Sequence, residues 1–152
     1  VKITGRETVI NYPIKINGYS FDISCVSMGN PHAVAFVDNP VDSIPLDRIG
    51  PIIENNPMFP NRVNFEIVNV LDQSNVKARV WERGSGLTMA CGTGACAIGV
   101  IGKILGRTGD KVNVSLPGGN LSVIWQGKNS DVLLEGPVEK VFEGEWVDVC
   151  AP

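Results

Sequence analysis

Apolar and polar side chains alternate along much of the chain with a period of two residues. Successive side chains of a β-strand point to opposite faces, so this alternation predicts strands that are buried on one face. Many of the same segments are rich in β-branched residues, which favour strands. The predicted strands cover residues 9–16, 21–27, 33–37, 63–70, 76–81, 112–116, 121–125, 132–134, 138–142 and 146–149.

Short turn sequences separate several of these strands and predict hairpins. Asn17-Gly18 has the composition of a tight hairpin turn. Turn-forming residues also connect the later strands, at positions 72–75, 117–120, 127–129 and 136–137. Because hairpins join antiparallel neighbours, the sheet is predicted to be largely antiparallel.

Two segments break the alternation and predict helices. The first covers residues 46–55 and is expected to be interrupted near Gly50-Pro51. The second covers residues 92–105 and is apolar on every side, which is typical of a helix that is buried all round. The predicted fold class is therefore α+β, with a curved, barrel-like sheet wrapped around one central helix.

The predicted central helix contains three glycines, at positions 94, 99 and 102. Each glycine costs about 1 kcal/mol of helix propensity. Several of them in one helix imply that neighbouring backbone approaches the helix closely.

Composition and charge fit one soluble globular domain. Of the 152 residues, 43% are hydrophobic and 19% are charged, and the formal net charge is −3. The chain lacks a run of like charges, which argues against nucleic acid and anionic membranes as partners. It also lacks an apolar run long enough to span a bilayer. The first residue is Val1 and not Met, so we expect the chain to begin partway through a longer protein.

The four cysteines are predicted to be free thiols in a reducing cytoplasm. Cys25 and Cys150 are expected to be small apolar fillers in or near strands. The sequence contains no Cys-x-x-Cys and no His/Cys cluster with the spacing of a zinc site. We therefore predict neither a disulfide framework nor a bound metal.

Cys91 lies where the second predicted helix begins, directly before Gly92-Thr93-Gly94. A helix N-terminus has unpaired backbone N–H groups and a partial positive charge, so it favours a bound carboxylate and lowers the pKa of a nearby thiol. Cys91 is therefore a candidate for proton transfer beside a carboxylate, and the alternative is a buried structural cysteine. Cys96 lies about 140° further around the helix and is expected to pack structurally.

Residues 92–97 also fit the pattern G-x-G-x-x-A of a dinucleotide-binding turn. That fingerprint needs a buried strand before it and an acidic residue at the end of the next strand. Asp110 precedes the next predicted strand, and the strands that follow have the character of hairpins and not of a βαβ crossover. Nucleotide binding is therefore the weaker interpretation of these glycines.

Polar residues elsewhere suggest a site for an amino acid. Glu82-Arg83 ends a predicted strand, and is either a solvated pair or a clamp that holds an ammonium and a carboxylate group. His32, the only histidine, follows Asn30 at a strand entrance, and Asn64 lies inside an apolar strand. Each of these three side chains is either structural or a ligand of a zwitterion.

Four motifs occur in an order that resembles the second half of the diaminopimelate epimerase family. They are Met28-Gly29-Asn30-Pro31-His32, Phe59-Pro60-Asn61-Arg62-Val63-Asn64-Phe65, Glu82-Arg83-Gly84 and Ala90-Cys91-Gly92-Thr93-Gly94-Ala95-Cys96-Ala97. The resemblance extends over essentially the whole chain, 1–152. Proline racemases and phenazine-biosynthesis-type isomerases share the fold, and their second-half motifs resemble this sequence less.

The resemblance implies an isomerase that interconverts LL- and meso-diaminopimelate for lysine and peptidoglycan synthesis, without pyridoxal phosphate or metal. Two cysteines exchange the α-proton on opposite faces of the substrate, and Cys91 matches the second of them. Gly92 and Thr93 would hold the α-carboxylate. Glu82 would hold the α-ammonium and, with His32, help to set the protonation of the thiol. The remaining matches, Asn30, Asn64 and Arg83, would bind the distal end of the substrate.

The family also has a first half, which carries the other cysteine and is absent from this chain. Cys25, Cys96 and Cys150 lack the Cys-Gly-helix context and are poor substitutes for that cysteine. We therefore predict a C-terminal domain that is inactive alone, that pairs with a missing N-terminal domain, and that forms a homodimer. A related racemase or isomerase and a non-catalytic binding or dimerisation domain remain the alternative interpretations.

Overall fold

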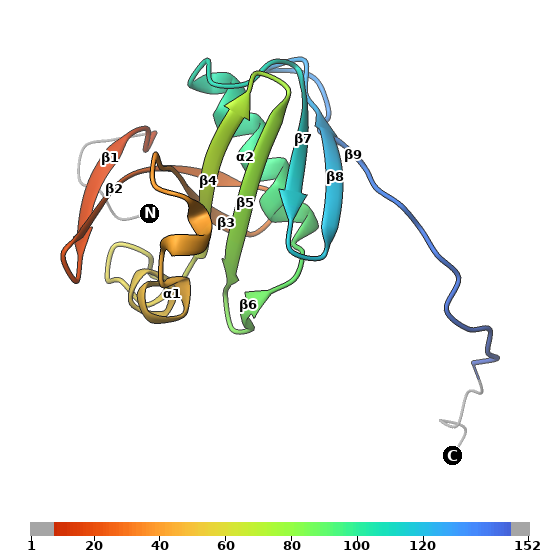
Figure 1. The fold of residues 1–152 in the computed structure, drawn as a ribbon, viewed down its shortest axis with the longest axis horizontal. Helices are drawn as coiled ribbons and strands as arrows, with labels where there is room; N and C mark the ends of the chain where they lie inside the picture. The colour runs from red at the N-terminus through yellow and green to blue at the C-terminus, as the bar shows by residue number, and fades with distance from the viewer. Residues whose placement is uncertain (1–7, 147–152) are drawn as a thin grey trace.

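The computed structural model describes residues 8–146, and its main feature is one strongly curved sheet (Figure 1). Its strands match the predicted alternation closely up to residue 135. They are β1 (Tyr12–Ile16), β2 (Tyr19–Ser27), β3 (Pro31–Phe36), β4 (Asn64–Asp72), β5 (Asn75–Glu82), β6 (Gly86–Thr88), β7 (Lys111–Leu116), β8 (Gly119–Ile124) and β9 (Leu133–Glu135). The helical elements are a 3₁₀ turn (Val41–Ser43), α1 (Leu46–Glu54) and α2 (Gly92–Ile104).

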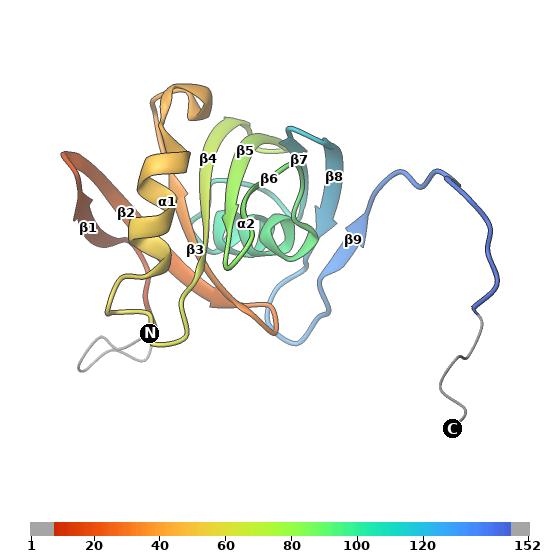
Figure 2. The same cartoon turned by 90° about the horizontal axis from the view of Figure 1, so that it is seen from below.

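The strand order is β1-β2-β3-β4-β5-β7-β8-β9, and β6 pairs with β5. The predicted antiparallel hairpins are confirmed for β1 with β2, β4 with β5, and β7 with β8. The predicted curved sheet around a central helix is confirmed, and the sheet is unclosed, since the strand order begins at β1 and ends at β9. Figure 2 shows the sheet curling around α2, which is seen nearly end-on.

Two strand pairs are parallel, β3 with β4 and β5 with β7. A parallel pair needs a long crossover connection. The α1 segment provides it between β3 and β4, and α2 provides it between β5 and β7. The expectation that only hairpins follow residues 92–97 is therefore wrong, since α2 joins the parallel strands β5 and β7.

The central strands are buried on both faces. On β4, Phe65 and Ile67 pack in a core that includes Leu46, Ile49 and Ile53 of α1. The opposite faces of β3, β4 and β5 pack in a second core against α2, whose buried members are Ala95, Ala97, Ile98 and Ile101. This double burial explains why residues 63–68 are all buried.

Helix α1 runs through Gly50-Pro51 without the interruption that the sequence predicts. The residues that surround this pair explain the continuity. Leu46, Ile49 and Ile53 are almost fully buried, and a Cβ on Gly50 would stand 2.3 Å from the Trp81 ring. We infer that this packing outweighs the cost of a proline inside the helix.

Helix α2 is buried over most of its length, as predicted. Its glycines, however, make room for side chains and not for the neighbouring backbone that was predicted. A Cβ on Gly99 would lie 2.7 Å from Cγ1 of Val123, and a Cβ on Gly102 would lie 2.5 Å from Oγ1 of Thr108. Side chains of the neighbouring strand and loop, and not backbone, therefore fill the space that these glycines leave. Cys96 is only partly buried, in contrast to the predicted packing role.

The segment after β9 leaves the body of the molecule as an extended arm (Figures 1 and 2). Residues 138–142, predicted as a strand, have no regular structure, and neither has Trp146. Val138, Phe142 and Trp146 are between 84% and 94% exposed, so the arm lacks the packing that a strand needs. The rest of the predicted strand 146–149 and Cys150 lie outside the described residues.

Candidate active site

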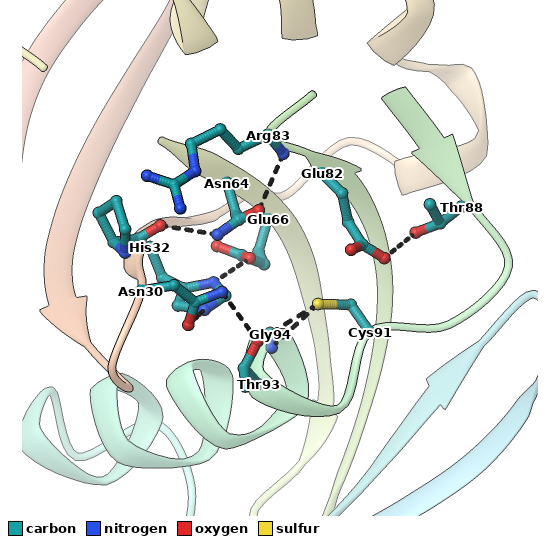
Figure 3. Close-up of polar contacts among 11 residues, drawn as sticks. Asn30, His32, Asn64, Glu66, Glu82, Arg83, Thr88, Cys91, Thr93 and Gly94 are labelled. Carbon is teal, nitrogen blue, oxygen red and sulfur yellow. Dashed lines mark hydrogen bonds and ion pairs between the residues drawn. The ribbon is translucent and has the colours of Figure 1, made fainter. Parts of the chain in front are cut away.

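The polar residues singled out from the sequence gather at one end of the sheet (Figure 3). This end is formed by the starts of the parallel strands β3 and β4, the end of β5 and the N-terminus of α2. Strand direction therefore brings His32 and Asn64, which are paired in register, to the same end as Glu82. Cys91 reaches it from α2.

Cys91 is the N-cap residue of α2, with extended backbone angles (φ −138°, ψ 110°). Its sulfur accepts a hydrogen bond from the backbone N–H of Gly94 at 3.3 Å and lies 3.6 Å from Oγ1 of Thr93. Only 7% of the residue is exposed. The sulfur therefore takes the place of the oxygen that usually caps a helix.

The predicted lowering of the Cys91 pKa is wrong for this chain. Desolvation by burial raises the pKa of the Cys91 thiol, and the carboxylate of Glu82 raises it further. The hydrogen bonds from Thr93 and Gly94 lower the pKa, but their effect is smaller. In the described part of the chain, Cys91 is therefore set up as a thiol, the form that can donate a proton.

This charge arrangement predicts how fast Cys91 reacts with iodoacetamide. Only the thiolate reacts, and a free cysteine thiol has a pKa of about 8.5. Because the pKa of Cys91 is raised, its labelling rate is expected to keep rising above that pH. Glu82→Gln removes one repelling charge, so we expect about three- to tenfold faster labelling near pH 8. Peptide mass spectrometry over a pH series measures both results.

Glu135→Gln is the control, because that carboxylate is exposed and pairs with Lys111. It is expected to leave the Cys91 rate unchanged. A labelling rate that levels off below neutral pH would contradict the raised pKa.

Glu82 and Arg83 do not form one clamp, because neighbouring residues at the end of a strand point in different directions. The Glu82 carboxylate accepts a 2.6 Å bond from Oγ1 of Thr88. The Arg83 guanidinium donates to the carbonyl oxygen of Asn61 at 2.9 Å. Figure 3 shows the two charged groups on different sides of the site, with Glu82 on the side of Cys91.

Asn64 uses both ends of its amide to join two loops. Its Nδ2 donates to the carbonyl oxygen of Pro31 at 2.9 Å, and its Oδ1 accepts from the backbone N–H of Arg83 at 2.8 Å. Asn64 therefore holds the start of β3 beside the turn after β5. This explains how an amide is satisfied inside an apolar strand.

Asn30 and His32 belong to a chain of polar contacts that reaches Cys91. Nε2 of His32 lies 2.9 Å from Oδ1 of Asn30, and Nδ2 of Asn30 donates to Oγ1 of Thr93 at 3.3 Å. Thr93 in turn lies next to the Cys91 sulfur. His32 is only 1% exposed, so it supports the site from behind.

Glu66 was not among the predicted site residues, yet it is fully buried and its Oε1 lies 2.6 Å from Nδ1 of His32. Desolvation raises its pKa, and the hydrogen bond with His32 opposes the rise. A charged residue between Phe65 and Ile67 was the available signal. Glu66 shares the face of Asn64, so alternation alone would have assigned it to the site.

A second missed carboxylate, Glu54, holds the turn that carries the site residues of β5. Its side chain accepts bonds from the Trp81 ring nitrogen at 2.7 Å, from the backbone N–H of Gly84 at 3.0 Å and from Arg62 at 3.0 Å. Gly84 has a positive φ of 82°, which suits glycine. Glu54 thus connects α1 to the loop that follows Glu82 and Arg83.

Within residues 8–146, no group of three or more His, Cys, Asp or Glu side chains is placed to hold a metal ion. None of the helices in that part of the chain is both long and apolar enough to cross a membrane. Three thiols, Cys25, Cys91 and Cys96, are free. Burial raises the pKa of Cys25 to about 12, so it is a poor nucleophile.

Solved structures resemble this fold at low sequence identity. A phenazine biosynthesis protein of the PhzF family from Enterococcus faecalis has a TM-score of 0.52 and 16% identity, over 70% of this chain and 39% of that chain. The PhzF-family protein from Bacillus anthracis gives 0.50 and 15%, over 75% and 38%. The chain thus has an α+β fold of the PhzF type, with a thiol at the N-terminus of its central helix.

The sequence profile of diaminopimelate epimerase matches residues 24–141, and the chain belongs to the diaminopimelate epimerase family. The enzyme of that name from Acetivibrio thermocellus is 52% identical over 92% of this chain and 50% of its own length. The one from Leptospira biflexa is 48% identical over 93% and 50%. The chain therefore spans about half the length of the curated relatives it matches.

Proposed function

We propose that this chain is the cysteine-bearing second half of a diaminopimelate epimerase, and that Cys91 exchanges a proton with the α-carbon of the substrate. The observation that carries the proposal is the position of Cys91, at the N-terminus of α2 and among polar side chains at one end of the sheet. The relatives that match this chain are named for that activity.

The burial of Cys91 supports a specific role in the proton transfer. A thiol with a raised pKa holds its proton until a stronger base appears, and the carbanion that forms at the α-carbon is such a base. We therefore assign Cys91 as the acid in one direction of the reaction and the base in the other. A second cysteine on the opposite face, supplied by a missing N-terminal domain, completes the inversion.

The α-carboxylate is assigned to the backbone N–H groups of Gly92 and Thr93. They lie in the first turn of α2, where the helix offers these donors no acceptor of its own. Hydrogen bonds to this carboxylate stabilise the charge that develops as the α-proton leaves. We assign the α-ammonium to Glu82, which stands on the Cys91 side of the site.

The distal end of the substrate is assigned to Asn30, Asn64 and Arg83. Arg83 lines a pocket of about 330 Å³ together with Gly29, Pro31 and Asn61. A guanidinium suits a carboxylate, so this pocket is the proposed place for the second carboxylate of diaminopimelate. The proposed reaction uses no cofactor. We propose that it serves lysine and peptidoglycan synthesis in the cytoplasm.

The exposed arm after β9 supports the proposal that a further domain belongs to this site. Val138, Val141, Phe142 and Trp146 are at least 84% exposed, which is costly for an apolar group of this size in water. We propose that the absent half covers this arm. The homodimer remains a separate proposal.

The chain alone is expected not to interconvert LL- and meso-diaminopimelate, because inversion needs an acid or base on each face of the α-carbon and one face has none. The measurement is the ratio of the two isomers over time, by chiral chromatography. The positive control joins this chain to the first half of the Acetivibrio thermocellus relative, and should interconvert the isomers rapidly. Rapid inversion by the isolated chain would refute the two-cysteine assignment, and a joined protein without inversion would refute the proposed activity.

A further inference from the structure

Glu66 is the buried carboxylate that the proposed proton transfer does not use. Its Oε1 lies 2.6 Å from Nδ1 of His32, and its Oε2 is buried without a hydrogen-bond partner among the described residues. Gly94 makes room for it at the start of α2, since a Cβ there would stand 3.1 Å from Oε1. A carboxylate this deep needs a proton or a positive charge close by.

The contacts around His32 determine how many protons the Glu66 carboxylate and the His32 ring hold between them. Oδ1 of Asn30 only accepts hydrogen bonds, so the ring nitrogen facing it, Nε2, must carry a hydrogen. Nδ1 faces Glu66, and the 2.6 Å contact between them requires one hydrogen. The pair therefore shares a single proton between Oε1 and Nδ1, and it is uncharged overall wherever that proton resides.

The contacts that continue from His32 to Cys91 also have a direction. Nε2 of His32 donates to Asn30, and the amide of Asn30 donates to Oγ1 of Thr93. The Thr93 hydroxyl hydrogen is then free to point at the Cys91 sulfur, 3.6 Å away. Every donor in this series points toward Cys91, which stabilises a thiolate there.

We propose that Glu66 is a positioning residue of this site: by sharing one proton with Nδ1 it holds the His32 ring with Nε2–H toward Asn30, and so directs the hydrogen bonds that end on Cys91. This inference deepens the proposed function, on which its catalytic meaning rests. In this role His32 is a donor and does not act as a base toward the substrate.

The histidine signal in an NMR spectrum tests the proposal directly, because His32 is the only histidine in the chain. A long-range ¹H–¹⁵N spectrum of the labelled 152-residue chain distinguishes a protonated ring nitrogen from a bare one. We expect one set of signals near pH 7, with Nε2 protonated. A bare Nε2 in the unmodified chain would overturn the proposal, since the amide of Asn30 would then be reversed and His32 would be a base.

Two substitutions separate positioning from simple packing. In Glu66→Gln the amide N–H can donate to Nδ1, so the single set of signals is expected to remain. In Glu66→Leu, which has a similar volume, Nδ1 loses its partner, and we expect mixed ring forms with two sets of signals. If the Leu variant is folded by circular dichroism and keeps the unmodified spectrum, Glu66 does not position the ring.

Labelling of Cys91 with iodoacetamide shows whether replacing Glu66 changes the hydrogen bonding at the Cys91 sulfur. We expect Glu66→Leu to slow labelling about three- to tenfold, because an ordered donor to the thiolate is lost. Glu66→Gln should stay within a factor of about two of the unmodified chain. Cys96 in the same sample is the internal control, with an unchanged rate.

Faster labelling in the Leu variant would mean that Glu66 acts as a bare negative charge, and would overturn the shared proton. None of these measurements uses diaminopimelate or the missing half. The positioning role of Glu66 can therefore fail while the epimerase proposal stands, and the reverse also holds.

Discussion

Replacing Cys91 with alanine, in the protein that joins this chain to the first half of the Acetivibrio thermocellus relative, is expected to lower kcat by about 10³-fold. The loss is large because a positioned acid or base accelerates proton transfer by about 10²–10⁴-fold. Water cannot replace it easily, since only 7% of Cys91 is exposed. Deuterium exchange at the α-carbon of LL- and meso-diaminopimelate, measured separately, gives the rate for each direction.

Cys96→Ala is the matched control for this prediction. Cys96 lies in the same helix, five positions later, and is also a free thiol with a raised pKa. Its replacement is expected to leave kcat within a factor of about two, because surface-facing substitutions away from the site are nearly neutral. If both variants lost kcat equally, the loss would come from damage to the helix and not from removal of the Cys91 sulfur.

Phe65→Ala is expected to lower the free energy of unfolding by about 3–5 kcal/mol, the usual cost of removing a fully buried phenylalanine. Phe65 is completely buried between α1 and the sheet, and its ring packs edge-on against Phe21 at 5.6 Å between centroids. A loss of this size is a large part of the stability of a domain. Urea unfolding followed by circular dichroism measures it.

Leu71→Ala on the same strand is the control, because Leu71 is 63% exposed. Its expected effect on the free energy of unfolding is within about 0.5 kcal/mol. If the Phe65 variant lost no more stability than the Leu71 variant, the two-sided burial of β4 would be contradicted.

Alternation and turn composition were sufficient to predict most of the strands up to residue 135. These signals are local, because a strand period of two and a tight turn depend on neighbours in the sequence. The same signals failed for residues 138–142, which are rich in β-branched and aromatic residues but have no partner strand beside them among the described residues. They also missed β6, whose three residues are too short for a pattern.

Part of the candidate site was also predictable. Cys91 precedes a glycine-led helix, and a helix start can be recognised from sequence, so its capping position followed. Glu82 and Arg83 were expected to act together, yet adjacent residues at a strand end point apart. Glu66 was overlooked although the alternation of β4 places it on the same face as Asn64.

The order of residues along this chain was therefore enough to define its strands, its central helix and the thiol at the start of that helix, since each depends on residues close together in sequence. Tertiary structure alone decided which strands are parallel, which carboxylates are buried, and that the pKa of Cys91 rises and does not fall. The physical reason is that pairing and desolvation depend on what surrounds a group in space. Glu66 and Cys91, 25 positions apart in the sequence, both lie against Gly94 only because β4 and α2 bring them together.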